Sequence, residues 1–380
     1  MHHPAVSEPI DELDAAVTEL LDAGRAPRLV YQPIVDIARL RVVGYEALSR
    51  FPGPLQASPD RWFAAAVRIG RAIELEAMVV EKALAARVHL PANCFLTINV
   101  APEALVSAPI QQLLQHTDLT RVVVELTEHS AVSDYDVVGR AVAQVRDRGG
   151  FIGVDDVGAG YASLHRILAI RPDFVKLDRE LITGLHNDEA KAALVEMFGG
   201  FTSRMDSWVV AEGIEQRDEL HRLVQLGVPL GQGYLLGRPA PEMGSLDLDP
   251  STLAPTLATT VTAAPQSTVA RLAHPCLTAP LDSPDGTLRT ALSDGSTLPL
   301  VILLDSGGRP TQLAQQSDPT TIERRDVLRI LDSTDQREAL RRAMTRPRPT
   351  RFDPLACCDM SGAFLGVVPI ERLIEALIVV

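Results

Sequence analysis

Residues 151–178 read FIGVDDVGAGYASLHRILAIRPDFVKLD, and this stretch decides the expected fold. Two short apolar runs, 151–154 and 174–177, flank a longer segment of mixed polarity. The first run leads directly into Asp155 and Asp156. A strand, a helix-length segment and a second strand in this order are typical of an α/β protein with parallel strands.

The same alternation extends outward in both directions from this stretch. Eight apolar runs are predicted strands: 28–35, 41–48, 94–100, 121–126, 151–154, 174–177, 208–211 and 228–236. Helical patterns lie between them, including 59–87, 133–147, 179–203 and 216–226. Eight such units in about 240 residues predict a closed (β/α)8 TIM-like barrel. An open doubly wound sheet has the same local pattern, but the count of eight favours closure.

Length, composition and charge exclude several classes of protein. The chain has 380 residues, so two or three folded units are expected, and 46% hydrophobic residues allow a sizeable core. Its net charge of −13 argues against a partner that is nucleic acid, because such a surface repels phosphate backbones. An anionic substrate would therefore need metal cations between it and the protein. Aromatic residues make up only 4%, which disfavours stacking on sugars or single strands.

Cysteine usage and the amino terminus predict a cytoplasmic protein. No zinc or redox spacing occurs among the four cysteines, which are Cys94, Cys276, Cys357 and Cys358. Residues 1–4 (MHHP) begin neither a basic region nor an apolar signal core. The longest strongly apolar run, 298–304, is far shorter than the ~20 residues of a membrane span. We therefore expect reduced thiols and no membrane partner.

A low-complexity stretch divides the chain. Residues 250–268 consist mainly of Ser, Thr, Ala, Pro and Leu, a composition typical of a linker. The predicted organisation is an N-terminal segment, a barrel, a linker and a smaller C-terminal α+β domain, with boundaries at 1–13, 14–242, 243–268 and 269–380.

The C-terminal domain shows a faint twofold repeat. Predicted strands 298–305 and 354–359 each end in an Asp-x-x-Gly turn. Asp305 and Asp359 are 54 positions apart, as are Gly308 and Gly362, so each unit is expected to end in a strand–turn–strand hairpin. An amphipathic helix over 370–377 closes the second unit.

Polar side chains lie at the carboxyl ends of most of the predicted barrel strands or directly after them. They are Glu46, Asn99, Glu125, Asp155 with Asp156, Lys176 with Asp178, Glu212 and Gln232. In a (β/α)8 barrel the carboxyl ends of the strands meet at one rim, so these side chains are expected to converge.

So many carboxylates at one rim would repel one another unless their negative charge is neutralised. Two like charges at ~4 Å repel by several kcal/mol at intermediate dielectric, so the acids must either protonate or bind cations. Oxygen ligands without His or Cys select Mg²⁺ or Mn²⁺ over zinc. The pattern therefore predicts a divalent-metal site at the barrel rim.

Three reaction types fit this rim. The favoured one is phosphodiester hydrolysis by a water that two metal ions activate, with Lys176 holding the water or a phosphate oxygen. Glycoside hydrolysis could use Glu125 and Glu212 as the acid and the nucleophile. Schiff-base chemistry at Lys176 would need a lowered lysine pKa, which neighbouring carboxylates oppose.

The ordered motifs resemble those of the EAL-type phosphodiesterases over about residues 14–242. The name-giving motif is Glu46-Ala47-Leu48 within 45–50. The other matching motifs are Tyr31-Gln32-Pro33-Ile34-Val35-Asp36, Asn99, Glu125 with Thr127-Glu128, Asp155-Asp156, Lys176-Leu177-Asp178, Glu212 with Glu215, and Gln232-Gly233-Tyr234. The resemblance implies hydrolysis of cyclic di-GMP to linear pGpG on a barrel whose first strand is antiparallel to the others.

The resemblance also implies two metal ions, Mg²⁺ or Mn²⁺, and a set of ligands. Those of the first metal would be Glu46, Asn99, Glu125 and Asp155. Those of the second would be Asp155 and Asp156, with Glu212 and Asp178 holding waters or completing its shell. The catalytic groups would be Glu46, Lys176 and Glu212, and Lys176 would position the attacking water.

Further roles follow from the same resemblance. Substrate contacts would come from Gln32, Arg50 and Gln232. Glu128 and Glu215 would anchor the loop over 155–164, which links activity to a homodimer in this family. The loop departs from the family at Val157 and Ala159, where larger residues are common, so its dynamics would differ rather than its chemistry.

Two wider expectations complete the interpretation. The C-terminal repeat resembles a degenerate pair of CBS modules, which implies a regulatory domain with a nucleotide ligand. Some EAL-type proteins have lost catalysis and act only as cyclic di-GMP receptors. This chain keeps the acidic residues and Lys176, so we expect an enzyme, with the receptor as the alternative.

Overall fold

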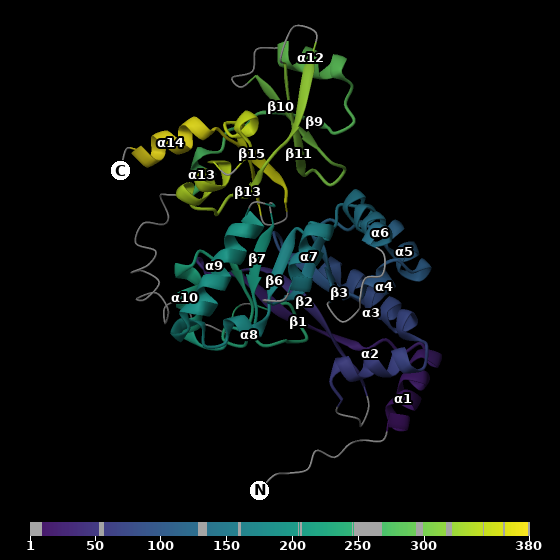
Figure 1. The fold of residues 1–380 in the computed structure, drawn as a ribbon. Helices are drawn as coiled ribbons and strands as arrows, with labels where there is room; N and C mark the ends of the chain where they lie inside the picture. Colours follow the sequence, from purple (N-terminus) through teal and green to yellow (C-terminus); the bar gives the residue numbers. More distant parts are fainter. Residues whose placement is uncertain are drawn as a thin grey trace.

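Eight strands close into a barrel in the computed structural model (Figure 1). The described residues are 10–52, 57–127, 135–158, 161–203, 205, 207–244, 246, 268–293, 299–316, 321–344, 346–359 and 362–378. The strands are β1 Arg28–Asp36, β2 Arg41–Arg50, β3 Phe95–Val100, β4 Val122–Leu126, β5 Phe151–Val157, β6 Phe174–Leu177, β7 Trp208–Ala211 and β8 Leu230–Gly231. Closure confirms the predicted TIM-like barrel.

The first strand runs against the others, as expected. β1 pairs antiparallel with both β2 and β8, whereas every other neighbouring pair of barrel strands is parallel. The eighth strand is shorter than the predicted 228–236. Regular pairing ends at Gly231, because the chain then turns and Ile214 donates its N–H to the carbonyl of Gln232.

Helices surround the barrel. They are α1 Ile10–Asp22, α2 Pro59–Arg68, α3 Ala72–Ala86, α4 Pro102–Leu105, α5 Ala108–Gln115, α6 Tyr135–Asp147, α7 Tyr161–Ile170, α8 Arg179–Ile182, α9 Glu189–Ser203 and α10 Arg217–Gln225, with 3-10 turns η1 Arg87–His89 and η2 Leu185–Asn187. None of the helices in these described ranges is long and apolar enough to cross a membrane.

Two predicted helices were wrong in extent. The stretch 59–87 forms α2 and α3, and Gly70 between them has φ +71°. The stretch 179–203 forms α8, η2 and α9, with Gly184 at φ +73° before η2. Glycine adopts this left-handed conformation at little cost, so it ends a helix even where apolar residues continue at helical spacing.

Aromatic side chains fill the floor of the barrel, at the amino ends of its parallel strands. Phe95, Phe151, Phe174 and Trp208 are each the first residue of a strand, and all are buried. The rings of Phe174 and Trp208 lie 4.9 Å apart at 81°, a favourable edge-to-face arrangement. Leu331, from the C-terminal domain, belongs to the same cluster. The barrel floor is therefore completed by a residue from outside the barrel.

The C-terminal domain contains two units with the same order of strand, helix, strand and strand. The first is β9 Leu277–Pro280, α12 Asp285–Ser293, β10 Leu300–Leu304 and β11 Pro310–Gln316, followed by β12 Ile322–Asp326. The second is β13 Arg329–Leu331, α13 Gln336–Met344, β14 Leu355–Cys358 and β15 Phe364–Val368, followed by α14 Ile370–Ile378. The 3-10 turns η3 Val269–Leu272 and η4 Arg348–Thr350 complete the domain.

Both units pair their strands alike. In each, the first strand is parallel to the second, and the second forms an antiparallel hairpin with the third. Gly308 and Gly362 have φ +76° and +80° in the two hairpin turns, a conformation that favours glycine at these related positions. Most of the predicted linker, 247–267, lies outside the described residues, and the likeness to CBS modules stays a prediction.

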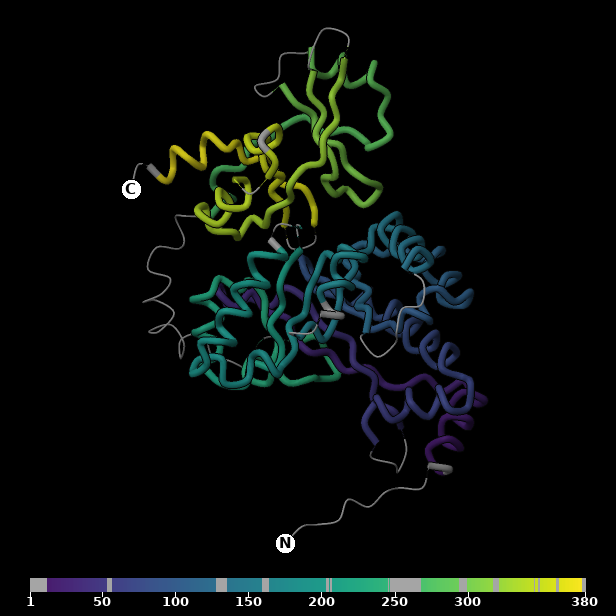
Figure 2. Tube along the Cα trace, viewed as in Figure 1, coloured from purple at the N-terminus to yellow at the C-terminus, as the bar shows by residue number. Residues whose placement is uncertain are grey.

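The C-terminal domain packs against the barrel floor (Figures 1 and 2). Arg309 follows the β10–β11 turn and is only 4% exposed. Its guanidinium lies 3.4 Å from the centre of the Phe151 ring and donates to the carbonyls of Gly149 and Gly150. Arg329 pairs with Asp173 at 3.1 Å. These contacts lie at the starts of β5 and β6.

The shared floor predicts coupled stability of the two domains. Leu331→Ala removes a fully packed side chain from the floor cluster, which should cost about 2–5 kcal/mol of unfolding free energy. We expect the barrel of this variant to unfold at a lower urea concentration than that of the unmodified protein, as followed by tryptophan fluorescence. Leu365→Ala, at a site 49% exposed in the same domain, is the matched control and should change little. An unchanged barrel transition in Leu331→Ala would contradict a shared core.

Candidate active site

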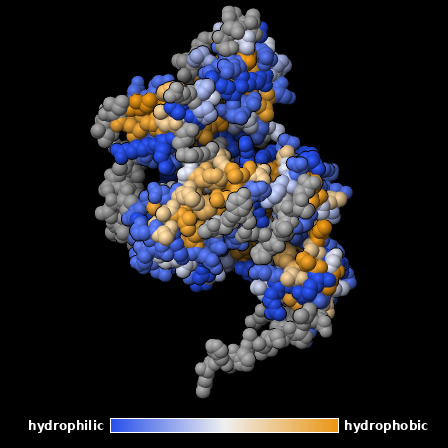
Figure 3. Space-filling model, in the orientation of Figure 1, coloured by the Kyte–Doolittle hydropathy of each residue, from blue (hydrophilic) through white to orange (hydrophobic). Residues whose placement is uncertain are grey.

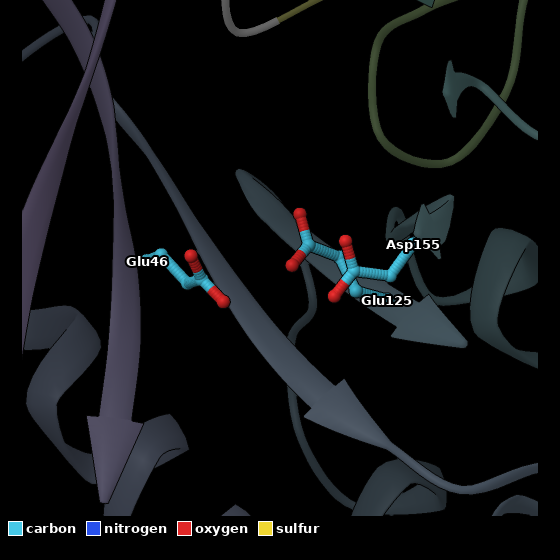
Figure 4. A group of neighbouring side chains, drawn as sticks. All are labelled: Glu46, Glu125 and Asp155. Carbon is cyan, nitrogen blue, oxygen red and sulfur yellow. The ribbon is translucent and has the colours of Figure 1, made fainter. Parts of the chain in front are cut away.

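Seven polar side chains meet at the carboxyl ends of the barrel strands. They are Glu46 on β2, Asn99 on β3, Glu125 on β4, Asp155 on β5, Lys176 on β6, Glu212 directly after β7 and Gln232 directly after β8. Figure 4 shows Glu46, Glu125 and Asp155 pointing toward one another from separate strands. The predicted convergence is therefore a feature of the structure.

Lys176 lies at the centre of this group and is only 1% exposed. Its Nζ contacts one oxygen of each of four carboxylates: Glu212 at 2.5 Å, Glu125 at 3.1 Å, Asp155 at 3.1 Å and Glu46 at 3.5 Å. One ammonium cannot neutralise four carboxylates. The excess negative charge requires protons or further cations.

The ionisation of the group reflects both burial and crowding. Burial by itself would lower the pKa of Lys176, but the four carboxylates hold its pKa well above the ordinary value. Burial raises the pKa of Glu125 well above its usual range despite the lysine. Burial likewise raises the pKa of Glu212 to about 8, although Lys176 acts to lower it. Near neutral pH, Glu212 therefore holds a proton, and Lys176 stays charged.

Two sets of carboxylate oxygens are compact enough to hold cations. In one set, oxygens of Glu46, Glu125 and Asp155 all lie within 4.8 Å of one another. In the other, oxygens of Asp155, Asp156 and Glu212 meet the same limit. Asp155 belongs to both sets. The geometry thus offers two adjacent oxygen sites that share one carboxylate.

Amide side chains line the first set. The Asn99 Nδ2 donates to Glu46 Oε1 at 2.7 Å, and the buried Oδ1 of Asn99 has no hydrogen-bond partner among the described residues. Gln232 donates from Nε2 to Glu46 Oε2 at 2.6 Å and to Gln32 Oε1 at 3.0 Å. A buried amide oxygen without a partner is costly, and a cation beside Glu46 would satisfy Asn99.

Glycine 153 makes room for Glu125. Gly153 on β5 is the register partner of Glu125 on β4, and a Cβ at this glycine would lie 2.9 Å from the Glu125 Cγ. A side chain there would push Glu125 out of place. Gly153 was not among the predicted site residues, although a glycine inside a strand is a known signal of close approach.

A buried threonine was also missed. Thr97 on β3 lies in register with Glu46 and two residues before Asn99, so the three side chains face the same side of the sheet. Its Oγ1 is buried without a hydrogen-bond partner among the described residues. The two-residue spacing from Asn99 was the signal that could have identified it.

The chain turns sharply at Asp156. This residue has φ +53°, and its N–H donates to Asp155 Oδ1 at 3.0 Å. A non-glycine residue in this region is strained, which is common at functional sites. Glu128, a predicted anchor of the loop, lies outside the described residues, as do residues 159–160 of the loop itself.

Three predicted residues stand apart from the two oxygen sets. Asp178 caps α8, accepting the N–H of Glu180 at 2.9 Å through Oδ1. Glu215 pairs with Arg179 at 2.9 Å. Arg50 ends β2 and donates to the Ser49 carbonyl at 2.8 Å. Their assigned roles in metal binding, loop anchoring and substrate contact stay predictions.

The EAL domain profile matches residues 14–239, more than half of the chain. The chain belongs to the EAL domain family. Its EAL domain is 30% identical over 222 residues to "Cyclic di-GMP phosphodiesterase PA2567" of Pseudomonas aeruginosa, covering 56% of this chain and 38% of that protein. It is 28% identical over 225 residues to "Probable cyclic di-GMP phosphodiesterase PdeN" of Escherichia coli, covering 56% and 43%. The chain thus spans less than half the length of these curated relatives.

Solved EAL structures are similar to this fold. The "PaMucR Phosphodiesterase, c-di-GMP complex" is 27% identical, with a TM-score of 0.54 that covers 60% of this chain and 98% of that one. The "Klebsiella pneumoniae BlrP1 pH 9.0 manganese/cy-diGMP complex" is 29% identical, with a TM-score of 0.52 and 57% of each chain covered. The first structure is a complex with the cyclic dinucleotide, and the second is a complex with manganese and the cyclic dinucleotide.

The contact at Gly153 yields a first prediction for the EAL domain. Gly153→Ala should displace Glu125 and weaken Mn²⁺ binding at least about tenfold, since misplacing or losing supporting groups typically costs 10–100-fold. Isothermal titration of Mn²⁺ checks this. Gly139→Ala is the matched control, because nothing lies within 4 Å of a Cβ there. Equal Mn²⁺ affinity in both variants would show that Glu125 is not held by this contact.

Metal binding should also release protons. Because the pKa of Glu212 is about 8 in the metal-free protein, its carboxyl is mostly protonated at pH 7 and must lose that proton to bind a cation. We expect roughly one proton released per chain at pH 7. Mn²⁺ affinity should rise with pH up to about 8 and then level off. Calorimetric titrations in buffers of different ionisation enthalpy measure the number of protons released. A number near zero would contradict the raised pKa of Glu212.

Proposed function

We propose that the EAL domain hydrolyses cyclic di-GMP to linear pGpG with Mg²⁺ or Mn²⁺ as cofactor, two ions per site. The observation that carries this proposal is the pair of oxygen sets that share Asp155 around the Lys176 ammonium. The cyclic di-GMP phosphodiesterases among the relatives and the cyclic di-GMP in similar structures support the substrate.

The side chains present fit such cofactors. All candidate ligands are oxygen donors, which suit Mg²⁺ and Mn²⁺, and a cation would give the Asn99 Oδ1 the partner that it lacks among the described residues. Glu46, Asn99, Glu125 and Asp155 would hold the first ion. Asp155, Asp156 and Glu212 would hold the second, with Asp178 reaching it through a water. When bound, such ions supply charge neutralisation of the phosphodiester and activation of the attacking water.

The protein's own groups then orient the reaction. Lys176 Nζ keeps its proton among the carboxylates, so it can donate a hydrogen bond to the attacking water or to a phosphate oxygen. Glu212 Oε1, at 2.5 Å, is its nearest acceptor and would hold the ammonium beside the second ion. A permanently charged lysine is unsuited to Schiff-base chemistry, which needs a free amine.

Substrate contacts would come from three side chains. Gln32 and Gln232 are joined by a buried hydrogen bond, and Gln232 also donates to Glu46. A substrate bound to these amides would therefore be positioned relative to Glu46, a proposed metal ligand. Arg50 stands at the carboxyl end of β2, where its guanidinium can bind a phosphate through two parallel hydrogen bonds.

Dimerisation and control by the C-terminal domain are part of the proposal. Figure 3 shows apolar side chains gathered over α7 and α9, where Leu168 and Met197 are 57% and 47% exposed. Such a patch suits packing against a second copy of the chain. The C-terminal domain contacts the starts of β5 and β6, whose other ends carry Asp155 and Lys176. This arrangement supports a regulatory role.

A turnover assay tests the function. Purified protein with Mn²⁺ should linearise cyclic di-GMP, and Glu46→Gln should reduce turnover at least about a hundredfold because it removes a proposed metal ligand. Glu81→Gln, on the exposed side of α3, is the matched control and should keep full activity. Chromatography of the nucleotides provides the measurement.

The same assay separates enzyme from receptor. If the unmodified protein binds cyclic di-GMP with Mn²⁺ but forms no pGpG, the hydrolase proposal fails and the chain is a receptor. If Glu46→Gln turns over the nucleotide at the normal rate, Glu46 is not a ligand and the first metal site has been assigned wrongly.

A further inference from the structure

A large cleft separates the barrel from the first unit of the C-terminal domain. Its cavity volume is about 1080 Å³, enough for a small organic molecule. The barrel contributes the end of α6 and residues 171–173 before β6, and the C-terminal domain contributes β9 and the β10–β11 turn. This cleft is at the barrel floor, at the opposite ends of β5 and β6 from Asp155 and Lys176.

Three arginines surround one buried carboxylate at the base of the cleft, and two of them pair with it directly. Asp173 is 7% exposed and pairs with Arg329 at 3.1 Å and with Arg146 at 3.5 Å. Arg309 is 4% exposed, and its guanidinium donates to the backbone carbonyls of Gly149 and Gly150. Positive charge therefore exceeds negative charge at the base.

The remaining carboxylates of the cleft reduce this excess but do not remove it at the base. The Oδ1 of Asp305 accepts the N–H groups of Gly307 and Arg309 within its own turn. Asp147 and Asp282 lie exposed at the rim of the cleft, where water screens their charge. With Asp305 counted, the base holds three guanidiniums against two carboxylates, and the most buried guanidinium is that of Arg309. An anion would balance this remaining positive charge.

A fourth arginine completes the arrangement. Arg171 lines the cleft, is exposed, and its guanidinium has no hydrogen-bond or ion-pair partner in the part of the chain that the structure describes. Its backbone has φ +49°, a strained conformation for this residue type, and its carbonyl accepts from Arg146. The Arg171 carbonyl thus holds the Arg146 guanidinium, while the Arg171 guanidinium itself stays available to a ligand in the cleft.

We propose that this cleft binds a small molecule bearing a terminal phosphate. Arginine forks match phosphate geometry, and a dianionic group would offset the surplus charge of the base. The cleft is larger than a phosphate alone, and apolar side chains such as Met205, Pro280 and Val327 line the remainder, so an organic body fits beside them. Because Arg146 and Arg171 belong to the barrel while Arg309 and Arg329 belong to the C-terminal domain, the ligand would hold the two together.

Binding of ADP and pyrophosphate to the full chain tests this proposal. Calorimetry in EDTA keeps the acidic rim free of cations, so that the rim repels both probes. We expect at least one probe to bind, and Arg171→Glu to weaken its binding by more than about tenfold, as expected for loss of a charge-assisted hydrogen bond. Arg140→Glu, also exposed on the barrel but outside the cleft, is the matched control and should bind normally.

Several results would overturn the proposal. The proposal fails if neither probe binds with a dissociation constant of about 1 mM or lower. Equal binding by Arg171→Glu and the unmodified chain would place the probe elsewhere, as would displacement of the probe by cyclic di-GMP. Circular dichroism confirms that the variants remain folded. None of these outcomes depends on whether the rim hydrolyses cyclic di-GMP.

Discussion

The buried ammonium of Lys176 among four carboxylates is the constraint on which the rest of the site depends. Strand closure brings the acids together, and a single positive charge cannot balance them. Burial raises the pKa of Glu125 and brings that of Glu212 to about 8, and a proton on Glu212 relieves part of the repulsion in the metal-free protein. Divalent cations would relieve the repulsion more fully and would turn an unfavourable cluster into a phosphodiester-binding surface.

The barrel holds this cluster from two directions. At the rim, Gly153 leaves space for Glu125, and the amides of Asn99 and Gln232 fix both oxygens of Glu46. At the floor, aromatic rings and Leu331 pack the amino ends of the same strands. Because Arg309 and Arg329 contact the starts of β5 and β6, these two short, densely packed strands connect the C-terminal domain with Asp155 and Lys176 at the rim.

Much of the fold and the site was predictable from the sequence, and the failures have physical causes. Apolar runs predicted all eight strands. The polar residues at the carboxyl ends of these runs predicted the acids and Lys176 of the site. Helix breaks at Gly70 and Gly184 were missed because helical periodicity continues across a left-handed glycine. The contact of Arg309 with Phe151 was not predictable, since it depends on how two domains meet rather than on any local pattern.

Diffraction from crystals grown with Mn²⁺, recorded at the manganese absorption edge, tests the central claim most directly. Two anomalous peaks should lie on either side of the Asp155 carboxylate, with Asn99 Oδ1 facing one of them and Lys176 moved away from at least one of its present acidic partners. An ordered site without manganese, with Lys176 still contacting all four carboxylates, would show that the lysine and protons alone neutralise the rim.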